Sequence, residues 1–187
     1  AKAIQCDLDT VDLHEALRGM HFDKVLALDI IEHLKSPEAF LEQLRNLPAC
    51  EGAELLVTVP NVAFGPVRIM LLLGFFNYGR RGILDRTHTR LFTFLSLRRL
   101  FEQCGFVVLR EDGVPAPFPL ALRGSPKIAG VLTSLNRVAI KLWKRMFSYQ
   151  ILCHAMPAPQ LQELLEATEL HSKEACENVS QLEPQLG

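Results

Sequence analysis

Two short apolar runs, each followed at once by polar residues, constrain the fold of this chain more than any other feature. Residues 24–28 and 55–59 are almost continuously apolar, which is typical of strands buried on both faces of a parallel sheet. Between them, Ser36 and Pro37 form a helix-start pattern, and the apolar residues that follow recur at helical spacing. A strand, a helix and a second strand in this order predict an α/β protein with a parallel sheet.

The rest of the chain divides into further expected elements. They are the tail of a strand at 3–6, helices at 11–18, 67–73, 95–104 and 128–147, and strands at 106–110 and 149–154, the last one antiparallel. Together they predict one domain over residues 1–159 with a helical insertion at about 115–147. A Glu/Gln-rich helix and tail are expected at 160–187. The connection at 61–92 is long for a compact domain, which is typical of a lid or a wall of a binding site.

Composition restricts the class of protein. Of the 187 residues, 49% are hydrophobic, which is enough for a folded core. The net charge of −1 offers no overall attraction for nucleic acid, so none is expected as a partner. The five cysteines contain no C-x-x-C pair and are odd in number. This pattern predicts reduced thiols in the cytoplasm and argues against a disulfide framework or a zinc site.

Charge is distributed unevenly along the second half of the chain. Residues 123–145 hold six basic residues and no acidic one. The helix expected at 128–147 therefore has an apolar face and a basic face, a pattern that predicts peripheral contact with an anionic membrane or a partner protein. The alternative is a helix that packs its apolar face on the sheet and leaves its basic face in solvent.

The first candidate site follows directly on the first apolar run. Asp29, Glu32 and His33 lie within five residues, and ionisable groups at the end of a buried strand are costly unless they are paired or used. His33 is a candidate base for a substrate hydroxyl, because its ordinary pKa is close to neutral. The alternative is that Glu32 and His33 cap the following loop. These three residues are also potential cation ligands, but magnesium sites usually draw ligands from separate segments, so no metal is expected.

Another candidate site lies within residues 79–88. Asp85 and His88 are three residues apart and can meet if the segment forms one turn. Asp85 would then orient or charge-stabilise the imidazole of His88, which is the arrangement that a general base requires. The alternative is a salt bridge of Asp85 with Arg86 and Arg90 that braces the loop.

Two further polar residues end expected strands. Asn61 follows the second apolar run and could hold a substrate or a cofactor through its amide. It could equally bond the backbone groups that Pro60 leaves free. Asp7 follows the strand tail at 3–6, and the alternative for it is an ordinary turn aspartate.

Four stretches together resemble the class I S-adenosylmethionine-dependent methyltransferases. They are FDKVLALDIIEHLKSPEAFL, LLVTVPNVA, LLLGFFNYGRRGILDRTHTRLFT and LRRLFEQCGFVV. More narrowly, they are similar to the branch that contains ubiquinone-biosynthesis O-methyltransferases, and the resemblance covers residues 1–154. It implies a Rossmann-like, doubly wound and mostly parallel sheet, with S-adenosyl-L-methionine as cofactor and a hydroxyl of a small molecule as methyl acceptor.

The resemblance also assigns residues to roles. It implies that Asp7 and Leu8 address the adenine and that Leu28 and Asp29 line the cofactor. It further implies that the catalytic residues His33, Asp85 and His88 and the substrate-binding residue Asn61 lie at the substrate rim. Arg86 is predicted as a second substrate-binding residue. The E/D-x-G-x-G-x-G turn of the family does not occur in this sequence.

The resemblance therefore implies a domain that lacks the first strands and this turn, with an open sheet edge that favours self-association. The alternative function is a non-catalytic, degenerate methyltransferase fold that acts as an interaction partner.

Overall fold

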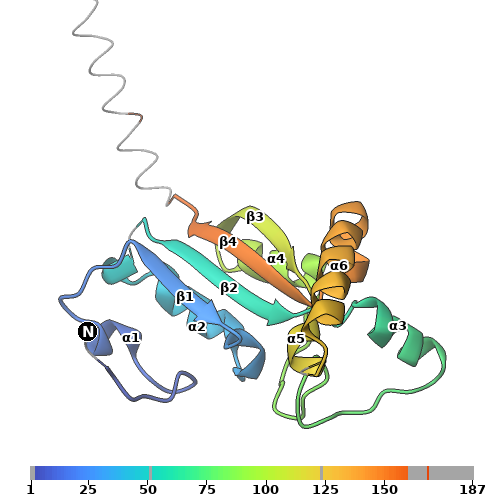
Figure 1. Cartoon of the computed structure of the whole chain (residues 1–187). Coiled ribbons are helices and arrows are strands. Elements are labelled where there is room, and N and C mark those ends of the chain that lie inside the picture. Colours follow the sequence, from blue (N-terminus) through green and yellow to red (C-terminus); the bar gives the residue numbers. More distant parts are fainter. Residues whose placement is uncertain (1–2, 51, 123, 160–167, 169–187) are drawn as a thin grey trace, which may run out of the picture. The chain divides into compact units, whose positions relative to one another are not determined.

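The computed structural model of the chain describes residues 3–50, 52–122, 124–159 and 168 (Figure 1). Contacts divide the chain into one unit at Ala1–Pro157 and another at Ala158–Gly187. The fold and the candidate site belong to the first unit. The helix and tail expected at 160–187 lie outside the described residues, apart from Thr168.

Four strands form one mixed sheet. They are β1 (Lys24–Leu28), β2 (Glu54–Pro60), β3 (Phe106–Val114) and β4 (Gln150–Pro157), in the order β1-β2-β4-β3. β1 and β2 are parallel, while β4 is antiparallel to both β2 and β3. Consequently β1, β2 and β3 run in one direction and β4 returns between β2 and β3 (Figure 1). The Rossmann-like α/β fold and the antiparallel last strand are confirmed.

The strand tail predicted at residues 3–6 is not formed. These residues are exposed and belong to none of the described strands. Their short apolar run therefore has no sheet neighbour, and the prediction from the pattern was wrong.

In the described part of the first unit there are six α-helices and two 3₁₀ turns; α1 precedes β1 and the others lie between strands. The α-helices are α1 (Leu13–Ala16), α2 (Pro37–Arg45), α3 (Gly65–Leu72), α4 (Phe94–Gln103), α5 (Phe118–Ala121) and α6 (Pro126–Phe147), and the turns are η1 (Ile31–His33) and η2 (Pro48–Cys50). The side chain of Ser36 accepts a hydrogen bond from the Ala39 N–H and so caps α2, as its position predicts. Thr93 and Ser96 form a capping box at the start of α4. None of the helices in the described part of the chain is long and apolar enough to cross a membrane.

The main core lies between one face of the sheet and helices α2 and α4 (Figure 1). Phe40 and Leu41 of α2, and Leu97 and Phe101 of α4, pack in the same buried cluster as Val57 of β2. The apolar spacing of both helices predicts this arrangement.

The opposite face of β1 is open. Leu26 and Leu28 are 59% and 51% exposed, although Ala27 between them is buried. The expectation that residues 24–28 are buried on both faces is therefore met on one face only. The reason is that none of the described helices covers the second face at this strand.

Candidate active site

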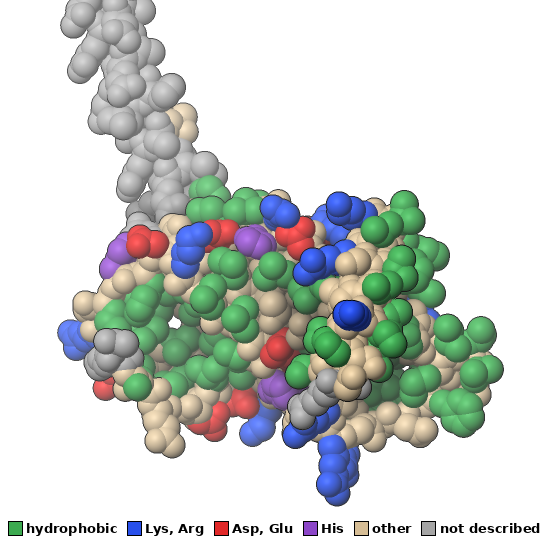
Figure 2. Space-filling view, in the orientation of Figure 1, with side chains coloured by type: hydrophobic (Ala, Val, Ile, Leu, Met, Phe, Trp, Pro, Cys, Tyr) green, Lys and Arg blue, Asp and Glu red, His purple; other side chains and the backbone are tan. Residues whose placement is uncertain are grey.

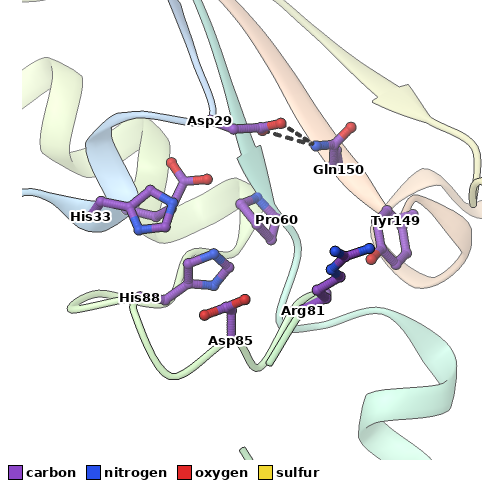
Figure 3. A pocket seen from close by; sticks show the side chains of 10 residues that line it. Asp29, His33, Pro60, Arg81, Asp85, His88, Tyr149 and Gln150 are labelled. Carbon is purple, nitrogen blue, oxygen red and sulfur yellow. Dashed lines mark hydrogen bonds between the residues drawn. The ribbon is translucent and has the colours of Figure 1, made fainter. Parts of the chain in front are cut away.

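A cavity of about 280 Å³ lies at the edge of the sheet where β1 and β2 end and β4 begins. Asp29 follows β1, Pro60 ends β2 and Gln150 starts β4. Ten residues line the cavity (Figure 3): Asp29, Glu32, His33, Pro60, Arg81, Gly82, Asp85, His88, Tyr149 and Gln150. Open α/β sheets bind ligands outside the carboxyl ends of their strands, so this cavity is the candidate active site.

Asp29 fixes one wall of this cavity. Its backbone has a left-handed φ of 52°, which is uncommon for a residue other than glycine. Its carboxylate accepts hydrogen bonds from Thr58 Oγ1 at 2.9 Å and from Gln150 Nε2 at 2.8 and 2.9 Å (Figure 3). Bonds to β2 and β4 thus hold an unfavourable backbone conformation at the point where the three strands meet.

Glu32 is the most unusual group in the cavity wall. Its residue is 1% exposed, and neither of its carboxylate oxygens has a hydrogen-bond partner among the described residues. Burial, with a smaller contribution from the nearby charge of Asp29, raises the pKa of Glu32 to about 7. A carboxyl group that titrates near neutral pH can either carry a proton or bind a cation.

The backbone of Glu32 ties the long connection to this site. Its carbonyl oxygen accepts hydrogen bonds from the Thr89 N–H at 2.9 Å, from Thr89 Oγ1 at 3.0 Å and from the Arg90 N–H at 3.2 Å. These bonds bring the segment that carries His88 beside η1, which carries His33. Two motifs that are more than 50 residues apart in sequence therefore form one site.

The rings of His33 and His88 meet edge to face, with 4.8 Å between their centroids. His33 Nδ1 lies 3.1 Å from the Thr87 carbonyl oxygen, and His88 Nδ1 lies 2.9 Å from the Ile83 carbonyl oxygen. Because a carbonyl oxygen can only accept, we assign the proton of each neutral ring to Nδ1. Nε2 of each ring then keeps a lone pair that can accept a proton.

The expected contact between Asp85 and the imidazole of His88 is replaced by a different one. Asp85 Oδ1 accepts hydrogen bonds from both the N–H and the Oγ1 of Thr87, each at 2.8 Å. These bonds hold the pKa of Asp85 below its ordinary value. The Ile83 carbonyl orients the ring of His88 instead, so the pairing inferred from the spacing is corrected. Asp85 still lines the cavity and lies close enough for the charge of His88 to lower its pKa further.

The arginines of residues 81–90 differ in their relation to the cavity, and the substrate-binding role of Arg86 stays a prediction. Arg86 is exposed and is not among the residues that line the cavity, whereas Arg81 is. Arg90 pairs with Glu38 rather than with Asp85, so this part of the proposed loop-bracing network is not formed.

Asn61 is fully buried and its amide is occupied by backbone groups. Its Nδ2 donates to the carbonyl oxygens of Arg145 at 3.2 Å and Ser148 at 2.9 Å, and its Oδ1 accepts from the Ala63 N–H at 3.1 Å. Asn61 is not among the cavity-lining residues. Of the two interpretations drawn from the sequence, these contacts favour the structural one.

The remaining predicted cofactor residues lie away from the cavity lining. Asp7 Oδ1 accepts a hydrogen bond from the Asp9 N–H at 3.0 Å within an exposed turn, and Leu8 packs partly against the core. Leu28 is the exposed last residue of β1. Their assignment to the cofactor stays a prediction.

Three cavity residues, Arg81, Tyr149 and Gln150, were not singled out from the sequence. Tyr149 and Gln150 stand at the start of an antiparallel strand, which lies at the same edge as the ends of the parallel strands. The predicted antiparallel direction of this strand could therefore have placed Tyr149 and Gln150 at the site. For Arg81, the sequence holds two adjacent arginines, Arg80 and Arg81, and no local pattern separates them.

Glu32, His33 and His88 could also hold a metal ion. One potential ligand atom from each lies within 4.8 Å of the others. A carboxylate with two imidazoles suits a divalent transition metal. This set differs from the Asp29, Glu32 and His33 set considered from the sequence, because the carboxylate of Asp29 is engaged by Thr58 and Gln150.

Comparison with known families identifies the protein family to which the chain belongs. The family model described as "Methyltransferase domain" matches residues 3–111, more than half of the chain. The chain belongs to the methyltransferase domain family. The match includes His33, Asp85 and His88 of the candidate site. A search of the curated proteins found no match.

Solved methyltransferase structures resemble the chain at low sequence identity. A SAM-dependent methyltransferase from Archaeoglobus fulgidus is 15% identical with a TM-score of 0.50, and the match covers 82% of this chain and 66% of that one. A possible histamine N-methyltransferase from Thermotoga maritima is 13% identical with a TM-score of 0.48, and the match covers 82% and 62%. The small RNA methyltransferase HEN1 is 16% identical with a TM-score of 0.47, and the match covers 82% and 15%. The chain thus spans between 15% and 66% of these three proteins, and the Archaeoglobus structure supports the fold.

Proposed function

We propose that this domain transfers a methyl group from S-adenosylmethionine to a hydroxyl of a small molecule, within the branch similar to ubiquinone-biosynthesis O-methyltransferases. The observation that carries the proposal is the His33–His88 pair at the carboxyl edge of the sheet. Each ring is oriented by a backbone carbonyl and keeps Nε2 available as a base. Family membership supplies the reaction class.

The cavity suits the methyl-bearing end of the cofactor, whose sulfonium is a permanent cation. Three carboxylates line the cavity, those of Asp29, Glu32 and Asp85, with one guanidinium, that of Arg81. A cavity lined mainly by carboxylates attracts a cation. Its volume lies near the lower end of the range for small-molecule sites, roughly 300–1,000 Å³. Asp29 would line this end of the cofactor, which supplies a methyl carbon open to in-line displacement by the acceptor oxygen.

The side chains of the cavity then remove the proton from the acceptor hydroxyl. His88 Nε2 takes the hydroxyl proton, and the bond to Ile83 keeps the tautomer that this step needs. The carboxylates of Glu32 and Asp85 offset the positive charge that forms on the ring. His33 lies against His88 and helps to position the hydroxyl.

A divalent cation held by Glu32, His33 and His88 would instead supply a Lewis acid for the acceptor oxygen. The two uses of the histidines differ in one measurable respect. Catalysis by a free base is insensitive to a chelator, whereas catalysis with a bound cation is lost in EDTA.

The alternative of a non-catalytic module is less consistent with the energetics of the site. A buried carboxylate without a hydrogen bond and a left-handed aspartate both oppose folding. A protein that acts only through its outer surface has no use for these two unfavourable features inside a cavity. A binding site does, because its ligand can interact with both residues.

The test is methyl transfer by the full chain from methyl-labelled S-adenosylmethionine, with phenols, sugars, hydroxy-lipids and a short RNA offered as acceptors. His88→Ala is expected to lower kcat about 10²–10⁴-fold, the usual effect of losing a general base, and to leave cofactor affinity nearly unchanged. His33→Ala is expected to lower kcat less and stability more. His21→Ala, at an exposed histidine outside the cavity, is the matched control.

Three outcomes would contradict the proposal. Equal and small losses of kcat in both histidine variants would contradict the assignment of a general base. Absence of cofactor binding by calorimetry, together with absence of transfer to every acceptor, would favour the non-catalytic module. Transfer to RNA alone would replace the small-molecule acceptor, because the expectation of no nucleic-acid partner stays a prediction.

A further inference from the structure

Large apolar side chains are exposed on α3, on the residues 73–78 that follow it, on α5 and on α6. Leu72 of α3 is 86% exposed and Leu142 of α6 is 83% exposed, and Phe75, Leu120, Leu135 and Trp143 are also exposed. Figure 2 shows hydrophobic side chains over both α3 and α6. We call these exposed apolar side chains the α3–α6 surface. Exposed apolar surface of this extent usually marks an interaction site.

The elements of the α3–α6 surface adjoin one another. Gly65 at the start of α3 packs against Met146 near the end of α6, where a Cβ on Gly65 would lie 3.3 Å from the Met146 side chain. α5 packs against α6. The apolar side chains of these elements therefore belong to one region of the molecule rather than to isolated positions.

The apolar stripe of α6 faces away from the sheet. Ile128, Val131, Leu135, Val138 and Leu142 recur every three or four residues, so they share one side of the helix, and all are exposed. The alternative drawn from the sequence, in which this face packs on the sheet, is corrected by this arrangement.

The sheet side of α6 is made by other residues. Ile140 is buried, and Lys144 reaches back to the Glu111 carbonyl oxygen at 2.8 Å and to the ring of Phe94 at 5.2 Å. With the sheet contacted in this way, the apolar stripe has no described partner.

The chain segments that form this surface carry charge of one sign. Residues 55–84 and 113–162 contain no Asp or Glu. Basic residues within these ranges include Arg68 beside the exposed end of α3, and Lys127, Arg137, Lys141 and Arg145 along α6. Glu111 and Asp112 on the adjacent strand β3 are paired with Arg98 and Arg110. An apolar surface whose own elements carry only cations complements an anionic lipid surface. A second copy of the same surface would bring like charges together and is disfavoured.

We propose that the α3–α6 surface seats the domain on an anionic lipid bilayer, with the apolar side chains in the headgroup region and the basic side chains at the phosphates. None of the described helices can cross a membrane, so the contact is peripheral. The proposal stands on exposure and charge alone and is independent of the proposed methyl transfer.

Vesicle flotation of the full chain tests the proposal directly. The probes are phosphatidylcholine vesicles with or without 30% phosphatidylglycerol, at low and at high salt. The chain is expected to bind the anionic vesicles at least tenfold more tightly and to lose binding in high salt. The double variant Leu135→Glu/Leu142→Glu is expected to reduce binding at least tenfold, and Arg137→Glu/Lys141→Glu to reduce both the binding and its salt dependence.

Leu95→Glu is the matched control, because Leu95 is an exposed leucine on the unrelated helix α4. It is expected to leave vesicle binding unchanged. Each variant is expected to stay folded, because all five replaced side chains are exposed. Circular dichroism of each variant checks this. Equal binding of both kinds of vesicle, or binding that survives Leu135→Glu/Leu142→Glu, would overturn the proposal. A dimer in light scattering that this double variant dissociates, without vesicle binding by the wild type, would make a second copy the occupant.

Discussion

Replacing Glu32 with Gln is expected to change how the stability of the chain depends on pH. Glu32 is enclosed in the cavity wall, and its carboxylate has no hydrogen-bond partner among the described residues. Glutamine has nearly the same shape but does not ionise. The pH dependence of the difference between wild type and variant therefore isolates the ionisation of this one side chain.

The magnitude follows from the burial of Glu32. Its pKa rises from 4.5 to about 7 in the folded chain, and each pH unit corresponds to about 1.36 kcal/mol. The folded state consequently binds more protons than the unfolded state between these two values. The stability that Glu32 contributes is fully present below pH 4.5 and is lost as the pH rises through about 7. The loss is about 3 kcal/mol in total and about 2.5 kcal/mol between pH 5 and pH 8.

The assay is urea unfolding of both proteins at pH 5 and pH 8, with EDTA present so that no cation binds the carboxylate. Relative to wild type, the free energy of unfolding of Glu32→Gln is expected to be about 2.5 kcal/mol larger at pH 8 than at pH 5, which means that the variant is relatively more stable at pH 8.

Glu38→Gln is the control for this assay. Glu38 pairs with Arg90, and this hydrogen bond lowers the pKa of Glu38 below its ordinary value. A group of this kind contributes stability that is present above its ordinary pKa and lost only in more acidic solution. The effect of Glu38→Gln is therefore expected to be the same at pH 5 and pH 8. An equally flat result for Glu32→Gln would refute the reasoning from burial and would mean that water reaches this carboxylate.

Two further changes test the packing that supports the cavity. Asn61→Ala leaves the carbonyl oxygens of Arg145 and Ser148 without their side-chain donor, so it is expected to lower the free energy of unfolding by about 1–3 kcal/mol in the same urea assay; a loss below 0.5 kcal/mol would mean that water replaces the amide. Gly113→Ala places a Cβ against the side chain of Ser148, so it is expected to destabilise the chain by about 1–3 kcal/mol, whereas Gly124→Ala meets open space and serves as its control.

The sheet and its main core were predictable from the sequence, because the pattern of apolar residues determines both. The runs at 24–28 and 55–59 became the parallel pair, and the helical spacing of Phe40 and Leu41 identified the buried face of α2. The same reasoning failed for α6. Periodicity shows that Leu135 and Leu142 share a face, but it cannot show whether that face meets the sheet or the solvent.

The candidate site was predictable in its location and less so in its contacts. Strand ends placed His33 near the cavity correctly, since the topology of parallel strands fixes which edge carries the ligand groups. The partners of the histidines were not predictable, because both are backbone carbonyls, those of Thr87 and Ile83, and every residue has one. The sequence also could not predict that the Glu32 carboxylate lacks a hydrogen-bond partner, because this depends on which described residues surround it in the folded chain.

The hydrogen bonds of Asn61 make the end of β2, the end of α6 and the start of β4 a stiff joint. The Asn61 N–H donates to the Tyr149 carbonyl oxygen at 2.9 Å, while the Asn61 amide holds the carbonyls of Arg145 and Ser148. Tyr149 in turn lines the cavity. A displacement of α6 is therefore expected to move Tyr149 and to change the shape of the cavity, because no flexible segment separates the helix from this residue.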